Sequence, residues 1–130
     1  MKKTTREWVK KAEADYRAAQ RLAGAKPPLH DQTCFHCQQG AEKYLKALLE
    51  ELGLAIPYTH VLLYLLGLLL PHYPSLRSLR RALAFLTRFA SGARYPGYNA
   101  TKRQSVAALC GVGKIRTAAR ALLGLRRLGP

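Results

Sequence analysis

Hydrophobic residues recur at the spacing of an α-helix from the start of the chain. The first set is Trp8, Ala12, Tyr16, Ala19 and Ala23, with lysines and arginines between them. This pattern is typical of an amphipathic helix, which we expect to end near Gly24. A second helix is predicted from an Asp31 cap to about Gly53, antiparallel to the first. Its apolar stripe consists of Cys34, Cys37, Ala41, Tyr44 or Leu45, Leu48 and Leu52.

The remaining pattern predicts three further helices, separated by breaks rich in proline or glycine. The third begins at a Thr59 cap and ends near Leu70, and its apolar residues on all sides indicate deep burial or an oligomer interface. The fourth begins at a Ser75 cap, with leucines inward and arginines outward. The fifth extends from about Thr101 to Leu128. Its predicted buried side consists of Val106, Cys110, Ala118, Ala121 or Leu122, and Leu125.

We find no alternating strand pattern and no linker, so residues 1–130 are predicted to form a single all-α domain. Its architecture is expected to be an up-and-down helical bundle of four to five helices. The densest apolar run, from Val61 to Leu70, has ten residues, well short of the roughly 20 that span a bilayer. The N-terminal residues lack the apolar core of a signal peptide. We therefore expect a cytoplasmic protein that does not associate with membranes.

Charge is distributed unevenly along this predicted bundle. Residues 1–51 carry ten Lys or Arg and all seven acidic residues, whereas residues 52–130 carry twelve Lys or Arg and no acid. Such a charge repels itself, so nucleic acid, a nucleotide or an acidic protein is an expected partner. An ordinary arginine-rich surface is the alternative, although thermophilic proteins favour balanced ion-pair networks. The predicted basic surface consists of Arg80, Arg81, Arg88, Lys102 and Arg103.

Two motifs that could indicate special chemistry have better structural explanations. Cys34 and Cys37 have the spacing of metal ligands, but they share one helix face, where free cysteines pack as small core residues. The segment from Gly111 to Lys114 resembles the end of a phosphate-binding loop, yet it lacks the first glycine, the hydroxyl residue after the lysine and a preceding strand. Close helix packing better explains its two glycines. We expect no metal, no cofactor and no disulfide.

The polar residues of the second predicted helix are more informative. Gln39, Lys43 and Lys46 lie near one another at helical spacing, beside the apolar stripe. Two adjacent glutamines ahead of a core run indicate buried hydrogen bonds. The alternative is a solvated face with an ion pair between Glu42 and Lys46. For His60 we expect a structural hydrogen bond rather than catalysis.

Three stretches together resemble the HEPN domain family of prokaryotes. They are Trp8-x3-Ala12-x2-Asp15-x2-Ala18, the run from Cys34 to Leu49 followed by Thr59-His60, and Arg94-Tyr95-Pro96. The resemblance implies a bundle that forms a homodimer, with a cleft between protomers lined by the residues just before the last long helix. Such proteins are often encoded beside a minimal nucleotidyltransferase, which is therefore an expected partner.

Many members of that family are ribonucleases, some of them toxins, with an arginine followed after four to six residues by a histidine. Here Arg94 is followed at the shortest such spacing by Asn99, and no histidine occurs after His72. Asparagine cannot act as a general acid or base, so the pattern favours binding over cleavage and leaves enzymatic activity an open question. The alternatives are a ribonuclease toxin with an unusual catalytic residue such as His60, and a purely structural oligomeric protein.

The sequence thus predicts a HEPN-type module that binds nucleotide or RNA, or presents substrate to the nucleotidyltransferase, in a toxin–antitoxin setting. A guanidinium among aromatic rings is suited to binding phosphate and stacking a base. The alternative for the loop is an arginine that caps a helix and rings that pack locally. The predicted nucleotide- or anion-binding residues are Arg94, Tyr95, Tyr98, Asn99, Lys43, Gln39 and His60.

Overall fold

The computed structural model describes residues 1–91 and 95–125. Over these residues the chain is helical and contains no strand, which confirms the predicted all-α class. A 3-10 turn, η1 (Pro74–Leu79), leads directly into the fourth helix. The helices are α1 (Lys3–Ala23), α2 (His30–Glu51), α3 (Leu62–Leu69), α4 (Arg80–Thr87) and α5 (Lys102–Leu122).

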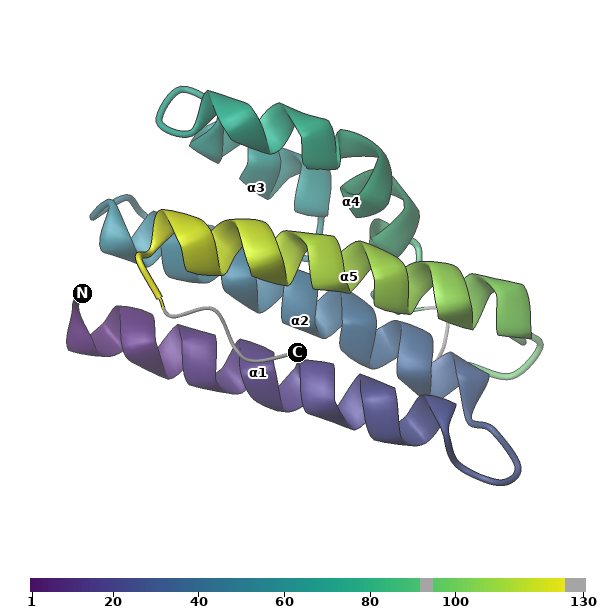
Figure 1. Cartoon of the computed structure of the whole chain (residues 1–130). Coiled ribbons are helices and arrows are strands. Elements are labelled where there is room, and N and C mark those ends of the chain that lie inside the picture. The colour runs from purple at the N-terminus through teal and green to yellow at the C-terminus, as the bar shows by residue number, and fades with distance from the viewer. Residues whose placement is uncertain (92–94, 126–130) are drawn as a thin grey trace.

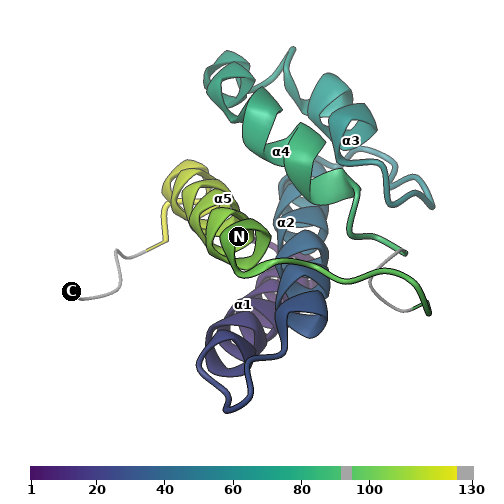
Figure 2. The ribbon, with the colours of Figure 1, turned by 90° about the vertical axis from the view of Figure 1, so that its right-hand side faces the viewer.

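The long helices α1, α2 and α5 lie side by side, and the short helices α3 and α4 form a second layer over them (Figure 1). Figure 2 shows the same arrangement along the helix axes, with α2 between α1 and the short layer. Within the described part of the chain, α2 is the helix that contacts all four others. The segment from α3 to α4 brings the chain back from the end of α2 to the opposite end of the bundle. Helix α5 therefore starts at the same end as α2 (Figure 1).

Burial of α2 explains its central place. The predicted apolar stripe is buried along its length, from Cys34 and Cys37 to Leu48, and only Leu52 at its end is half-buried. Both cysteines are therefore core residues, as predicted. Burial, helped by the nearby Asp31 charge, raises the pKa of the Cys34 thiol to about 11, and burial also raises the pKa of Cys37. These thiols are protonated at neutral pH, the form that packs in an apolar core.

Three of the predicted helix caps are wrong. Helix α2 begins before Asp31, whose carboxylate instead accepts a hydrogen bond from the Ala100 backbone N–H at 2.5 Å. Helix α3 begins at Leu62, and Thr59 accepts a hydrogen bond from the Val61 N–H two residues on. Ser75 lies inside η1. The side chains of Asp31 and Thr59 thus bond to a distant segment and to a local N–H, respectively, which sequence spacing does not distinguish from a cap.

Helix α5 has the predicted start but buries a different face. Thr101 caps it and forms a capping box with Gln104. Val106, predicted to be buried, is 58% exposed, and Cys110 is also exposed. The observed face is rotated from the predicted one and contains two larger apolar residues, Val112 and Ile115, that the prediction left out. The buried side consists of Ser105, Ala108, Gly111, Val112, Ile115 and Ala119.

The other helices follow the predicted patterns more closely. Helix α1 ends at Gly24 as expected, although Trp8 is only half-buried and Val9 lies in the core. Helix α3 is buried on one side only, since Tyr64 and Gly67 are exposed. The inward leucines of the fourth segment are confirmed, and they are Leu76, Leu79, Leu83 and Leu86.

Close helix packing occurs at a glycine that the sequence analysis did not single out. A Cβ at Gly40 would lie 3.3 Å from Val112 Cγ2 and 3.6 Å from the Ala12 carbonyl oxygen, so α1, α2 and α5 all meet at this position. At Gly111 and Gly113, the two predicted packing glycines, the nearest contacts of a Cβ are 3.6 and 3.8 Å away, which are ordinary van der Waals distances. Gly40 therefore sets the separation of the three long helices.

We expect Gly40→Leu to lower the free energy of unfolding by about 2–3 kcal/mol, because the new side chain overlaps two neighbouring helices. The matched control is Gly67→Leu, since a Cβ at this helical position meets no atom within 4 Å. That control should stabilise the protein by up to about 1 kcal/mol through helix propensity. Urea unfolding measures both effects, and similar changes for the two variants would contradict close packing at Gly40.

Candidate functional site

A buried hydrogen-bond network is centred on the Glu42 carboxylate of α2. Lys46 Nζ donates to Glu42 Oε2 at 2.9 Å, and Gln38 Nε2 donates to Oε1 at 3.0 Å. His60 Nδ1 lies 2.8 Å from the same Oε1 atom. Gln39 Nε2 extends the network by donating to Gln38 Oε1 at 2.7 Å. Glu42 is only 4% exposed, so the predicted ion pair with Lys46 exists but is buried, not solvated.

Electrostatics keep Glu42 ionised. Burial by itself raises the pKa of this carboxyl, but the hydrogen bonds from Lys46, His60 and Gln38 together outweigh burial and hold the pKa below its ordinary value. The predicted structural hydrogen bond of His60 is therefore present. The His60 side chain is 57% exposed, and its Nε2 makes no hydrogen bond with the described residues.

Two further carboxylates of α1 are paired with cations. Asp15 is shared by Lys43 Nζ at 2.6 Å and His36 Nδ1 at 2.8 Å. Lys43 was predicted to bind an anion, and its ammonium already contacts one that belongs to the chain. Sequence reasoning missed the role of His36, whose only signal was its position one turn before Gly40 on the polar side of α2.

Glu13 joins α1 to the last helix. Arg116 donates to it through Nε at 2.6 Å and Nη2 at 3.1 Å, and Arg120 Nη1 donates at 2.7 Å. The Tyr44 hydroxyl donates to the same carboxylate. Burial by itself raises the pKa of Glu13. The hydrogen bonds from Arg116 and Tyr44 and the charges of Arg116 and Arg120 together outweigh burial, so the net pKa lies below its ordinary value. These partners lie far apart in sequence, so no local pattern predicted them.

The ion pairs of the described residues involve acids of α1 and α2 only. Two arginines from the acid-free part of the chain, Arg116 and Arg120, form ion pairs with Glu13. The other described cations of that part are exposed and form no ion pair within the described residues. We call them the basic arc, and they are Arg77, Arg80, Arg81, Arg88, Lys102, Arg103 and Lys114.

The basic arc follows η1 and α4 and continues onto α5, which lies next to α4 (Figure 2). A shallow groove of about 730 Å³ separates η1 from α5 and is lined by Ser78, Lys114 and Thr117 among others. Two members, Lys102 and Arg103, stand in the first turn of α5, which holds no acidic residue. The predicted basic surface is thus exposed, as expected.

The predicted binding loop divides into exposed and packed residues. Tyr95 is 61% exposed. Tyr98 is half-buried, and its ring packs edge-on against that of Phe89, with 6.2 Å between the ring centroids. Asn99 lines a small pocket of about 240 Å³ at the start of α2, beside His30. Arg94, the central residue of the prediction, lies outside the described residues.

The structure therefore does not gather the predicted binding residues into one site. Gln39 and His60 belong to the Glu42 network in the middle of α2, and Lys43 faces α1. Asn99 lies apart from them at the start of α2, Tyr98 packs on Phe89, and Tyr95 is exposed. Within the described residues no group of three or more His, Cys, Asp or Glu side chains is placed to hold a metal ion.

Residues 5–122 match the HEPN domain. The chain belongs to the HEPN domain family. This confirms the resemblance inferred from the run Cys34–Leu49 and the two other stretches. No curated protein matches this HEPN chain significantly in sequence. None of the described helices of the HEPN chain is long and apolar enough to cross a membrane.

Solved structures support the HEPN fold. The crystal structure of TT1696 from Thermus thermophilus is 27% identical, covers 90% of this chain and 96% of its own, and superposes with a TM-score of 0.81. The structure of ST0689, described as an archaeal HEPN homologue, is 24% identical and covers 95% of this chain and 99% of its own, with a TM-score of 0.74. At 24% identity, the similarity to ST0689 supports the fold only.

The Glu42 network predicts a specific loss of stability in acid. Folding lowers the pKa of Glu42 below its ordinary 4.5, so the resulting stabilisation is complete above pH 4.5 and disappears as the pH falls through and below that value. Glu42→Gln should lower the free energy of unfolding at pH 7 by about 3 kcal/mol, because Lys46 loses its buried partner. The free energy of unfolding should also fall less steeply with decreasing pH in this variant, because the titrating carboxyl is gone.

Urea unfolding at a series of pH values measures both quantities. The matched control is Glu7→Gln, an exposed carboxyl of α1, which should change stability by no more than about 0.5 kcal/mol. If the free energy of unfolding fell as steeply with decreasing pH in Glu42→Gln as in the parent protein, this carboxyl would not stabilise the fold.

Proposed function

We propose that this HEPN protein binds the phosphates of RNA or of a nucleotide through the basic arc. The observation that carries this proposal is the separation of charge: the ion pairs of Glu13, Asp15 and Glu42 lie within the framework of α1, α2 and α5, and the arc is left without acidic partners among the described residues. An anionic ligand supplies the missing countercharges. It also relieves the repulsion of a chain with a formal charge of +15.

The arc offers two kinds of contact to such a ligand. Its five arginines present planar guanidinium groups, which bind phosphate oxygens in pairs. Lys102 and Arg103 add charge at the N-terminus of α5, where the helix dipole also favours an anion. The exposed ring of Tyr95, between Arg88 and Lys102 in sequence, provides a surface on which a base can stack.

We further propose that the protein acts as a cytoplasmic homodimer that presents substrate to a minimal nucleotidyltransferase, in a toxin–antitoxin pair. Family membership supports this assignment. Exposed apolar side chains beside His60 support self-association, since Tyr58 is 99% exposed and Val61 and Tyr64 about half exposed. Co-expression with the product of an adjacent nucleotidyltransferase gene should give a complex on gel filtration, and separate elution would count against that partner.

The RNA version predicts a steep dependence of affinity on salt. Because each phosphate contact releases counterions, affinity for a short single-stranded RNA should fall at least about tenfold between 50 and 200 mM salt. The double substitution Arg80→Gln/Arg81→Gln should weaken binding and reduce the salt slope by about 2. Fluorescence anisotropy with labelled RNA measures both.

The matched control for that experiment is Arg17→Gln/Arg21→Gln, which removes the same charge from exposed positions of α1 outside the arc. It should reduce affinity much less. Equal losses in the two double variants would mean that only total charge matters. Affinity that does not change with salt would overturn RNA binding through the arc.

A second candidate function, RNA cleavage, is favoured by the geometry of His60. Its Nδ1 faces the ionised Glu42 carboxylate at 2.8 Å, an arrangement that holds the proton on Nδ1 and leaves Nε2 as an exposed base. Such a base can take the proton of a ribose 2′-hydroxyl. The oxygen then attacks the adjacent phosphorus, a 2′,3′-cyclic phosphate forms as the bond from phosphorus to the 5′-oxygen breaks, and the 5′-oxygen takes a proton from water.

This candidate predicts that the purified protein cuts RNA and leaves cyclic phosphate ends. His60→Gln should lower the cleavage rate by at least about 100-fold, the usual contribution of a general base. The control His72→Gln changes an exposed histidine of the turn after α3 and should leave the rate unchanged. RNA that remains intact after long incubation with the parent protein would eliminate cleavage and leave binding.

A further inference from the structure

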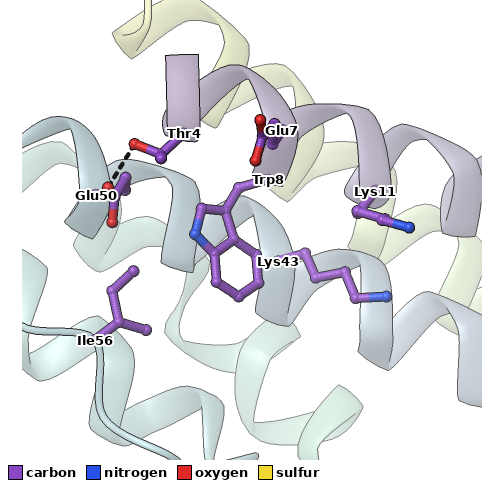
Figure 3. A pocket seen from close by; sticks show the side chains of 7 residues that line it. All are labelled: Thr4, Glu7, Trp8, Lys11, Lys43, Glu50 and Ile56. Carbon is purple, nitrogen blue, oxygen red and sulfur yellow. Dashed lines mark hydrogen bonds between the residues drawn. The ribbon is translucent and has the colours of Figure 1, made fainter. Parts of the chain in front are cut away.

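A pocket of about 670 Å³ lies between α1, the second half of α2 and the segment that follows α2 (Figure 3). This volume is within the range of sites that hold small organic ligands. The pocket is distinct from the basic arc, because no arc residue lines it. Its lining residues are Thr4, Glu7, Trp8, Lys11, Lys43, Glu50 and Ile56.

The indole of Trp8 forms the apolar wall of this pocket. In Figure 3 the ring lies between Ile56 and Lys43. Trp8 is half-buried, and the Lys46 ammonium lies 5.9 Å from the ring centroid, held there by its bond to Glu42. A flat ring with an exposed surface at the wall of a cavity is suited to stacking against another planar ring.

Two ammonium groups are placed beside that wall. Lys11 and Lys43 extend to the same side of Trp8 in Figure 3, away from Ile56. Lys11 forms no ion pair with the described residues. Lys43 contacts Asp15 Oδ2 at 2.6 Å, but an ammonium carries three N–H donors, so it can also contact a ligand. Asp15 thereby holds Lys43 at the edge of the pocket.

Acidic groups complete the lining on the other parts of the rim. Glu50 accepts a hydrogen bond from the Thr4 hydroxyl at 2.6 Å, as Figure 3 shows. Glu7 is exposed and lines the pocket above Trp8. With two ammonium and two carboxylate groups the lining is balanced in charge. Such a lining disfavours a polyanion like RNA and favours a ligand with one anionic group.

We infer that this pocket binds a small molecule in which one planar aromatic ring carries a single anionic group, such as a nucleoside monophosphate. The ring stacks on Trp8, the anionic group contacts Lys11 and Lys43, and a hydroxyl or amino group of the ligand donates to Glu7. The inference does not rest on RNA binding by the basic arc, since the two surfaces share no residue.

Trp8 is the only tryptophan of the chain, so intrinsic fluorescence reports directly on this pocket. Titration with adenosine 5′-monophosphate should change the Trp8 emission saturably. Adenosine alone and inorganic phosphate alone should each bind at least about tenfold more weakly, because each lacks one of the two contacts. These arms separate the contribution of the ring from that of the anionic group.

Lys11→Gln should weaken the binding of the monophosphate about tenfold, through loss of a charge-assisted hydrogen bond. Lys10→Gln, at the adjacent exposed position outside the pocket, should leave it unchanged. Both variants alter exposed side chains and should unfold at the temperature of the parent protein.

Three results would overturn the inference: no saturable fluorescence change with the monophosphate, equal affinity for adenosine, or unchanged affinity in Lys11→Gln. The Arg80→Gln/Arg81→Gln variant distinguishes this site from the arc. It should show the same saturable change of Trp8 emission with the monophosphate as the parent protein even where its RNA affinity is reduced, and a parallel loss of both would place the monophosphate on the arc.

Discussion

The structure depends on the pairing of polar groups along α2, the helix that contacts every other helix of the described chain. Burial of a charged or polar side chain on such a helix is costly unless the side chain is paired. Glu42 is held by Lys46, Gln38 and His60, and Tyr44 donates to Glu13. These bonds also tie α2 to α1, to the segment before α3 and, through Glu13, to α5. The same contacts that make burial possible therefore fix the arrangement of the bundle.

This pairing has an electrostatic consequence for the rest of the protein. The ion-paired carboxylates of α1 and α2, Glu13, Asp15 and Glu42, are engaged within these two helices, with His60, or with Arg116 and Arg120 of α5. They are not available to neutralise η1, α4 and the start of α5, which carry cations and no acids. The framework and the basic arc are thus two results of one distribution of acids along the sequence. The anionic partner that we propose for the arc rests on this arrangement, whereas the ligand that we propose for the Trp8 pocket rests on the balanced charges of that pocket.

Fold class, the extent of α1 and α2 and the HEPN family were predictable from sequence, because hydrophobic periodicity and the Gln38–Leu49 motif are local signals. Burial of Gln38 and the pairing of Glu42 with Lys46 were predictable for the same reason. The buried face of α5 was not, since apolar residues occur on both sides of this helix, and Val112 and Ile115 rather than Val106 face the core. Pairs such as Glu13 with Arg116 were also beyond prediction, because they join residues distant in sequence. Asp31 was misassigned because its carboxylate bonds the distant Ala100 rather than its own helix.

The central claim is that internal pairing on α1 and α2 leaves the basic arc as the anion-binding surface. Amide chemical-shift mapping during titration with a short single-stranded RNA tests it most directly, because every helix is observed in one experiment. The account predicts that the perturbed amides belong to η1, α4, residues 95–103 and the exposed side of α5, and that those of α1 stay unchanged. Perturbation concentrated on α1, with the arc unaffected, would contradict it.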